Sequence, residues 1–299
     1  MQQKTLSIGY GFPEGPAQGP DGLVYLVEMG GRAVSRFGPD GKREKLADID
    51  GTPGAVAWGL DGAMYVPNQG NLDFVDGRPR GASEGNVSGS IDRVTRDGVV
   101  TCLYRDCGDE LLIAPNDIVF DPEGGFYFTD SEHGDFFQDP IQWPKGRVFW
   151  AAADGSEIRK VATDYELPNG IAIKNDGKTL LVCETLTFTV WAHDIRGPGE
   201  VGPRRLYAKL PDGHMPDGCA VDSDDHLVVA AVRAGALVHF GPDGDLIKRI
   251  PTEDTDVTNC CFIGDQRTTL IATEGFLGRV VAFEWERPGM VPFPERQWT

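Results

Sequence analysis

Short apolar runs, each preceded by a turn rich in glycine and acidic residues, recur along the whole chain. Such runs are typical of β-strands, and few long helices are expected among them. The copies are GPDGLVYLVE (19–28), GLDGAMYVPN (59–68), DPEGGFYFTD (121–130), KNDGKTLLVCE (174–184), DSDDHLVVAAV (222–232) and, degraded, GDQRTTLIATE (264–274). The pattern predicts an all-β protein built from one repeated unit.

A second hairpin-like segment follows each copy, as in AVSRFGPDGKREKLA (33–47) and SIDRVTRDGVVTCLY (90–104). Two hairpins per repeat correspond to a four-stranded propeller blade, which needs about 40 residues. Six repeats therefore predict a six-bladed β-propeller in which residues 1–299 form a single domain. A β-sandwich is the competing architecture, but it would not require six copies of the same turn.

Two stretches interrupt the strand pattern and are predicted to be long loops. Residues 68–89 are rich in Gly, Asn, Ser and Asp without a strand period, so a surface loop is expected there. Residues 131–146 carry several aromatic side chains and are the better candidate for covering a site.

One position of the repeat carries polar residues that suit a metal ion. Seven residues before each turn acid stand Glu14, Gly54, Asn116, Asn169, Asp217 and Thr258. This position begins the innermost strand of each blade, and innermost strands line the central channel of a propeller. Glu14, Asn116, Asn169 and Asp217 are therefore predicted to converge on the axis. Each also lies beside Pro or Gly, which by itself indicates only an ordinary turn.

Two carboxylates buried together would repel each other unless a cation compensated them. The four residues are accordingly predicted to hold one divalent metal ion, with two charged and two neutral oxygen ligands. An all-oxygen set favours Ca²⁺, with Mg²⁺ or Mn²⁺ as alternatives, and suits Zn²⁺ less well.

Net charge and composition limit the kinds of molecule that the protein is expected to bind. The formal net charge of −18 opposes binding to nucleic acid or to anionic lipid surfaces. The sequence contains no run of 18 apolar residues and no secretion signal at its start, so a cytoplasmic location away from membranes is expected. A small molecule is the expected partner. The six cysteines show no zinc-ligand spacing, and a thiol nucleophile at Cys183, Cys219 or Cys260 is a distant alternative.

The segments EGP (14–16), PNDIVFDPEGGFYFTDS (115–131), LPNGIAI (167–173), MPDGCAVDSDDHLVVA (215–230) and VTNCCF (257–262) resemble the SMP-30/gluconolactonase/LRE family of metal-dependent six-bladed propellers. The resemblance implies that Glu14, Asn116, Asn169 and Asp217 are the metal ligands. It also implies a hydrolase acting on lactones or, in some members, on organophosphorus esters.

One departure from the family pattern bears on the substrate. Ala114 stands where sugar-lactone members often have an arginine, so a polyhydroxylated substrate is disfavoured. A set of mainly aromatic residues is predicted at the channel mouth and favours an apolar or aromatic lactone. This set consists of Trp58, His133, Phe136, Phe137, Trp143, His214 and Met215.

In the predicted reaction the metal polarises the ester carbonyl while a base activates water. Asp217 is the first candidate for this base and Glu14 the second. Asp130 and Glu184 are candidates for orienting the ligands from behind. A non-catalytic propeller, in which the ion only ties the blades together, is the alternative from a different functional class.

Overall fold

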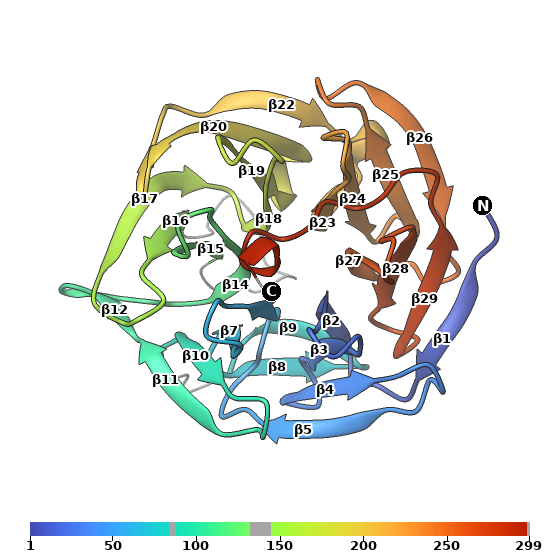
Figure 1. Cartoon of the computed structure of the whole chain (residues 1–299), viewed down its shortest axis with the longest axis horizontal. Coiled ribbons are helices and arrows are strands. Elements are labelled where there is room, and N and C mark those ends of the chain that lie inside the picture. The colour runs from blue at the N-terminus through green and yellow to red at the C-terminus, as the bar shows by residue number, and fades with distance from the viewer. Residues whose placement is uncertain (84–87, 132–144, 298–299) are drawn as a thin grey trace.

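A computed structural model describes residues 1–83, 88–131 and 145–297, and it shows a six-bladed β-propeller (Figure 1). The predicted fold class is therefore confirmed. The blades surround a central axis like sectors of a disc, and each is an antiparallel sheet.

Five blades are continuous in the sequence and run from the innermost strand outwards. The first contains β2 (Pro13–Gln18), β3 (Val24–Glu28), β4 (Ala33–Phe37) and β5 (Glu44–Asp48). The second contains β6 (Ala57–Trp58), β7 (Met64–Asn68), β10 (Ser90–Val94) and β11 (Val100–Tyr104). The third contains β14 (Pro115–Phe120), β15 (Phe126–Asp130), β16 (Gly146–Ala151) and β17 (Ile158–Tyr165). The fourth contains β18 (Pro168–Ile173), β19 (Thr179–Glu184), β20 (Thr189–Gly197) and β22 (Arg205–Lys209), with β21 (Glu200–Val201) also pairing with β20. The fifth contains β23 (Met215–Val221), β24 (Leu227–Val232), β25 (Ala236–Phe240) and β26 (Leu246–Pro251).

The sixth blade joins the two ends of the chain and closes the ring. Its three inner strands are β27 (Val257–Ile263), β28 (Thr269–Glu274) and β29 (Arg279–Glu284), and its outermost strand is the N-terminal β1 (Lys4–Ile8). Lys4 lies opposite Ala282, and Ile8 lies opposite Arg279. Because β1 pairs with β29, the two ends of the chain meet in one blade and the ring is closed.

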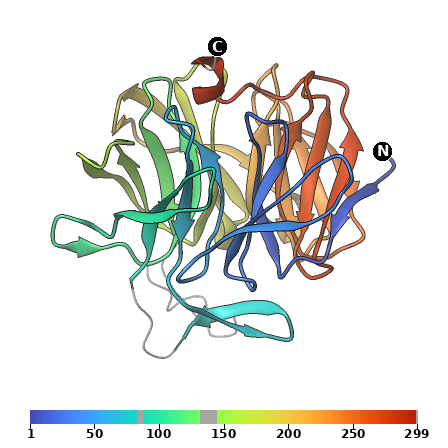
Figure 2. The same ribbon diagram turned by 60° about the horizontal axis from the view of Figure 1, so that its bottom comes forward.

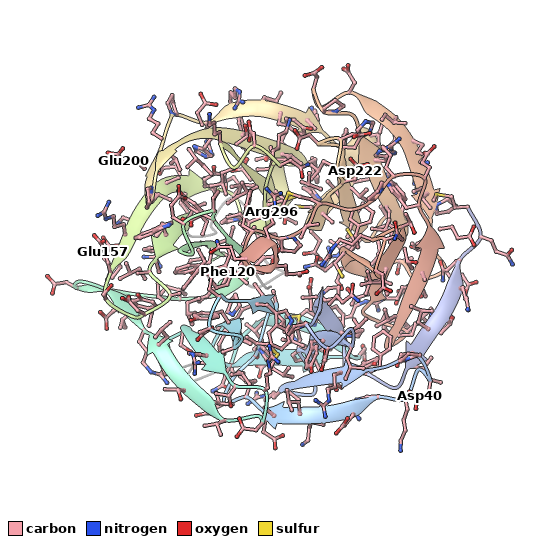
Figure 3. All side chains as sticks on the ribbon, in the orientation of Figure 1. Asp40, Phe120, Glu157, Glu200, Asp222 and Arg296 are labelled. Atoms are coloured by element: carbon pink, nitrogen blue, oxygen red, sulfur yellow. The ribbon has the colours of Figure 1, made fainter. Side chains whose placement is uncertain are left out.

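Apolar layers between neighbouring blades form the core. Tyr25, Tyr65, Phe126 and Phe128 are almost completely buried within them. Figure 3 shows side chains filling the spaces between the blades, with charged residues such as Asp40, Glu157 and Glu200 at the rim. The apolar side chains of each blade thus pack against the sheet of the neighbouring blade.

The segment 68–89 was predicted to be a loop, and this prediction is wrong in part. Among its described residues, β8 (Leu72–Val75) pairs with β9 (Arg78–Ala82) as a hairpin that projects from one face of the propeller (Figure 2). Leu72 and Phe74 pack against Phe12 and Met29 of the first blade. The alternation of apolar and polar residues was hard to recognise because both strands are short and β9 has the sequence RPRGA. A further short hairpin joins β12 (Asp106–Cys107) to β13 (Glu110–Leu111).

Acidic or amide side chains at the ends of the second strands fix the segments that lead to the axis. Asp130, completely buried at the end of β15, accepts hydrogen bonds from the backbone N–H groups of Ile113 (3.1 Å) and Ala114 (2.7 Å). Its carboxylate is also paired with Arg147 at 2.7 Å. The equivalent residues Glu28, Asn68, Glu184 and Glu274 accept bonds from backbone N–H groups in the same way. Asp130 and Glu184 thus act on the backbone that leads to the candidate ligands.

Replacing Asp130 with alanine should lower the free energy of unfolding by about 3 kcal/mol, because two buried N–H groups and the Arg147 guanidinium lose their acceptor. Urea unfolding monitored by circular dichroism measures the change. Asp48→Ala, which removes a carboxylate at an exposed site, should stay within about 0.5 kcal/mol of the wild type. Equal effects of the two substitutions would refute this role of Asp130.

Candidate functional site

The four predicted ligands come together on the wall of one cavity of about 250 Å³ at the channel end nearest the β8–β9 hairpin. Glu14, Asn116 and Asn169 each occupy the second position of an innermost strand, and Asp217 occupies the third position of β23. Thr258, the equivalent residue of the sixth blade, lines the same cavity. In the second blade this position is Gly54, where a Cβ atom would lie 2.2 Å from the carbonyl oxygen of Asn116.

An irregularity in the strand ladder lies at the candidate ligands. The pairing of β2 with β3 shifts register between Glu14 and Ala17, and that of β14 with β15 shifts between Pro115 and Ile118. The fourth, fifth and sixth blades show equivalent shifts. Bulges change the direction of side chains locally. These irregularities therefore accompany the positions at which side chains turn toward the axis.

Among the described residues, hydrogen bonds reach only one of the two carboxylate oxygens of Glu14. The backbone N–H of Gly15 and the side-chain amide of Asn259 (2.9 Å) both donate to its Oε2 atom. Burial raises the pKa of Glu14 well above its ordinary value, and the nearby carboxylates of Asp217 and Asp117 add to this effect. Among the described residues, no hydrogen bond is recorded for Oε1, so this oxygen is available to a ligand.

Asp217 is almost completely buried and lies beside the side-chain amide of Asn169. Burial raises its pKa well above the ordinary value, and Asp117 and Asp256 contribute in the same direction. The charged form of this carboxyl group is thus unfavourable without a nearby cation.

Asn169 provides a direct test of whether the cavity suits a metal ion. Its buried Oδ1 atom has no hydrogen-bond partner in the described part of the chain. A buried carbonyl oxygen without a partner is costly, and a cation would satisfy it. Together with the two repelling carboxyl groups, this oxygen shows that the donor set fits a divalent metal ion.

Two further polar residues, which were not predicted from the sequence, lie one position beyond the ligand position of the repeat. Asp117 accepts hydrogen bonds from the backbone N–H groups of Ile118 (2.8 Å) and Ile171 (3.3 Å), and burial raises its pKa to about 7. Asn259 is the partner of Glu14 described above. Applying the same repeat offset plus one residue would have found both.

The predicted substrate contacts are only partly brought together. Met215 lines the cavity, whereas neighbouring His214 is not among its lining residues. Trp58 was predicted at the mouth, but it lies on the wall of a separate cavity at the other end of the channel and packs edge-on against Tyr25. The physical reason is that Trp58 lies four residues further along its strand than the ligand position. His133, Phe136, Phe137 and Trp143 lie outside the described residues.

The far cavity and the cysteines do not support a thiol enzyme. Cys219 and Cys260 line this far cavity rather than the one with the candidate ligands. Burial raises the pKa of Cys260 well above its ordinary value, and a hydrogen bond with Cys219, together with burial, does so for Cys183. Thiols of this kind stay protonated and are poor nucleophiles.

A second group of potential metal ligands, Asp222, His226 and His239, lies at the turn between β23 and β24 and on the neighbouring strand β25. Arg287 already supplies a positive charge there, because its Nε atom lies 2.8 Å from Asp222 and its Nη2 atom lies 3.3–3.4 Å from both histidines. The pair of histidines is itself in hydrogen-bond contact at 3.0 Å. A cation of the protein therefore occupies the position that a metal ion would take.

Comparison with known proteins agrees with this architecture. The sequence profile of the SMP-30/gluconolactonase/LRE-like region matches residues 12–275. The chain belongs to this family. It is 33% identical over 191 residues to diisopropyl-fluorophosphatase from Loligo vulgaris, covering 60% of each chain. It is 31% identical over 236 residues to lactonase drp35 from Staphylococcus saprophyticus, covering 77% of this chain and 66% of the relative. The alignments thus span about three fifths to two thirds of the length of these relatives.

Solved structures share the fold across nearly the whole chain. A gluconolactonase from Xanthomonas campestris superposes with a TM-score of 0.77 at 24% identity, covering 94% of this chain and 89% of the other. The calcium-binding protein regucalcin from Agrobacterium tumefaciens gives 0.75 at 17% identity, covering 97% and 95%. At this identity the likeness concerns the fold. Within the described residues, no helix is both long and apolar enough to cross a membrane.

Acid should destabilise the protein through His239. Burial and the nearby His226, Lys248 and Arg287 lower its pKa to about 4. The unfolded chain binds this proton below about pH 6.5 and the folded chain only near pH 4, so stability is unaffected above pH 6.5 and falls by roughly 3 kcal/mol as the pH drops through this window. His239→Phe should lose less stability between pH 7 and 4 than the wild type, measured by urea unfolding at both values. An identical loss would contradict this assignment.

Proposed function

We propose that this protein is a metal-dependent hydrolase that opens lactone rings. The observation that carries the proposal is the convergence of Glu14, Asn116, Asn169 and Asp217 on one cavity, with the Oδ1 atom of Asn169 left without a partner. Membership of the SMP-30/gluconolactonase/LRE-like family and the likeness to lactonase drp35 support the reaction class.

In this proposal Glu14 and Asp217 supply the charged ligands, and Asn116 and Asn169 supply neutral carbonyl oxygens. Ca²⁺ is the proposed ion, because hard oxygen donors without His or Cys suit it. Regucalcin, a neighbour in fold, is described as calcium-binding. When bound, the ion would polarise the lactone carbonyl and stabilise the negative charge that develops on its oxygen.

Asp217 is the proposed general base. Its carboxylate lies on the cavity wall among the candidate ligands and can accept a proton from a water molecule bound there. It takes a proton from the attacking water and later returns it to the alkoxide released when the ring opens. Glu14 is less suited, because two N–H donors already bind its Oε2 atom.

The cavity wall supports an apolar or aromatic lactone rather than a sugar lactone. Hydrophobic side chains from several blades, among them Phe12, Leu72, Leu167 and Met215, make up much of this wall. Ala114 is completely buried, and its backbone N–H is bound by Asp130, so this position presents no polar side chain. Sugar hydroxyl groups that lie against these apolar side chains would lose water without regaining hydrogen bonds there.

Organophosphorus esters are a second candidate substrate class. The specific support is the 33% identity over 191 residues to diisopropyl-fluorophosphatase. The same donor set would bind a phosphoryl oxygen in place of a carbonyl oxygen.

Removal of metal with a chelator should abolish lactone hydrolysis and lower the melting temperature, and Ca²⁺ should restore both. A ligand present at a hundredfold excess over its dissociation constant stabilises the folded state by about 2.7 kcal/mol. Hydrolysis rates and differential scanning calorimetry provide the measurements. Full activity in protein shown by elemental analysis to be free of metal would exclude the metal from the reaction, and stabilisation without any hydrolysis would favour a non-catalytic propeller.

Asp217→Asn should reduce kcat by roughly a hundredfold or more at saturating Ca²⁺, because a general base is lost while an oxygen ligand of similar size remains. Asn116→Asp, which leaves the base in place, serves as the comparison. The experiment requires metal occupancy to be measured alongside kcat. Near-wild-type kcat in fully loaded Asp217→Asn would exclude Asp217 as the base.

γ-Phenyl-γ-butyrolactone should be hydrolysed with at least a tenfold higher kcat/KM than gluconolactone, equivalent to about 1.4 kcal/mol in transition-state binding. The physical reason is the group of apolar side chains on the cavity wall, among them Phe12, Leu72 and Leu167. Initial rates followed by acid release measure both substrates under the same conditions. The reverse preference would contradict the proposed substrate class.

A further inference from the structure

Two arginines, Arg78 and Arg233, reach the cavity that holds the candidate ligands. Arg78 begins β9 in the hairpin inserted into the second blade, and Arg233 lies in the turn between β24 and β25 of the fifth blade. The sequence has Ala114 where related sugar lactonases often have an arginine. The structure provides positive charge at the cavity from two other parts of the chain.

Arg78 is held in a defined orientation. Its Nε atom forms an ion pair with Asp256, whose side chain is only 6% exposed, and its guanidinium group stacks over the ring of Phe276 at 4.0 Å. Among the described residues, its Nη atoms have no recorded partner. A guanidinium fixed by one edge and one face presents its remaining N–H groups without a large loss of side-chain entropy on binding.

Arg233 has no hydrogen bond or ion pair with any other described residue, although the backbone around it is firmly held. Arg249 donates to the carbonyl oxygen of Ala234 (2.6 Å), and the N–H of Gly235 donates to the carbonyl oxygen of Thr255 (3.2 Å). These bonds place the turn beside the segment that carries Asp256. Arg233 therefore lies on the same side of the cavity as the partner of Arg78.

The cavity wall carries three carboxylates, Glu14, Asp217 and Asp256, and two arginines, and the proposed cation would balance Glu14 and Asp217. Asp256 balances Arg78, whereas the charge of Arg233 has no counterpart among the described residues, although acidic residues outnumber basic ones by 46 to 28 in the chain. Arg233 is exposed on the cavity wall, where its guanidinium group can bind an anionic group of the ligand.

We infer that the preferred lactone has an apolar body and carries a carboxylate away from the ring, which Arg233 and Arg78 bind. This inference rests on the proposed function and specifies its substrate class. The two arginines position the substrate and take no part in bond breaking, so they should act on KM much more than on kcat.

The test uses two lactones of nearly equal size, γ-(4-carboxyphenyl)-γ-butyrolactone and its neutral 4-carbamoyl analogue. Ca²⁺-loaded wild-type protein should hydrolyse the carboxylate with a kcat/KM at least about tenfold higher, and this preference should weaken as salt is added. Arg233→Gln should remove most of the preference by raising KM for the carboxylate, while kinetics with the carboxamide change less than about twofold. Arg78→Gln should act in the same direction.

Arg205→Gln is the matched control, because it removes one positive charge from an exposed outer strand, where Arg205 pairs with Asp194. This variant should keep the wild-type preference. Equal treatment of the two lactones by the wild type, or an undiminished preference in both Arg233→Gln and Arg78→Gln, would overturn the inference.

Failure of the proposed function gives a different result. If the wild type hydrolyses neither lactone, both compounds become inert ligands, and their binding can be measured by isothermal titration calorimetry. Tighter binding of the carboxylate, lost in Arg233→Gln, would still support the anion site. Binding that does not distinguish the two compounds would overturn it independently of the reaction.

Discussion

Hydrogen bonds from backbone N–H groups to buried carboxylates hold the centre of this propeller together. Glu28, Asp130, Glu184 and Glu274 each end the second strand of a blade and accept N–H groups from the segment that leads into the innermost strand. Each is also paired with an arginine, namely Arg43, Arg147, Arg204 and Arg279. The arginines offset the cost of burying the carboxylates, and the carboxylates fix the backbone on which the candidate ligands are mounted. The geometry at the axis therefore depends on these four pairs.

A second constraint arises where the innermost strands meet. Glu14, Asp117 and Asp217 are all buried close to the axis, and burial raises the pKa of each. The carboxylate of Asp117 adds to this increase for Glu14 and for Asp217. Such an arrangement opposes folding unless protons or a cation neutralise it. The carboxyl groups that suit a metal ion are thus the same groups that make the apo protein less stable, which couples the site to the stability of the whole ring.

The sequence was sufficient to predict the parts of the molecule that repeat. Six turn-and-strand units indicated six blades, and a fixed offset within them located four residues that share one cavity. The non-repeating parts were not predictable in this way. The β8–β9 hairpin departs from the repeat, and its partners, Phe12 and Asp256, come from the first and sixth blades. Trp58 was misplaced because an aromatic residue near a ligand position in sequence can lie a full strand length away from it in space. Arg233 gave no signal at all, since its importance lies in the lack of a nearby counter-charge.

The C-terminal segment makes the two ends of the channel different. The short 3₁₀ helix η4 (Pro294–Gln297) lies over the axis on the face opposite the β8–β9 hairpin (Figures 1 and 2). Arg267 anchors it through Glu295, and Arg296 bonds to the backbone carbonyl of Asn175. With η4 over this end, the candidate site lies at the other end of the channel, on the hairpin face. Substrate and product would then enter and leave through that face. A carrier surface attached at the C-terminus would, for the same reason, leave that face free.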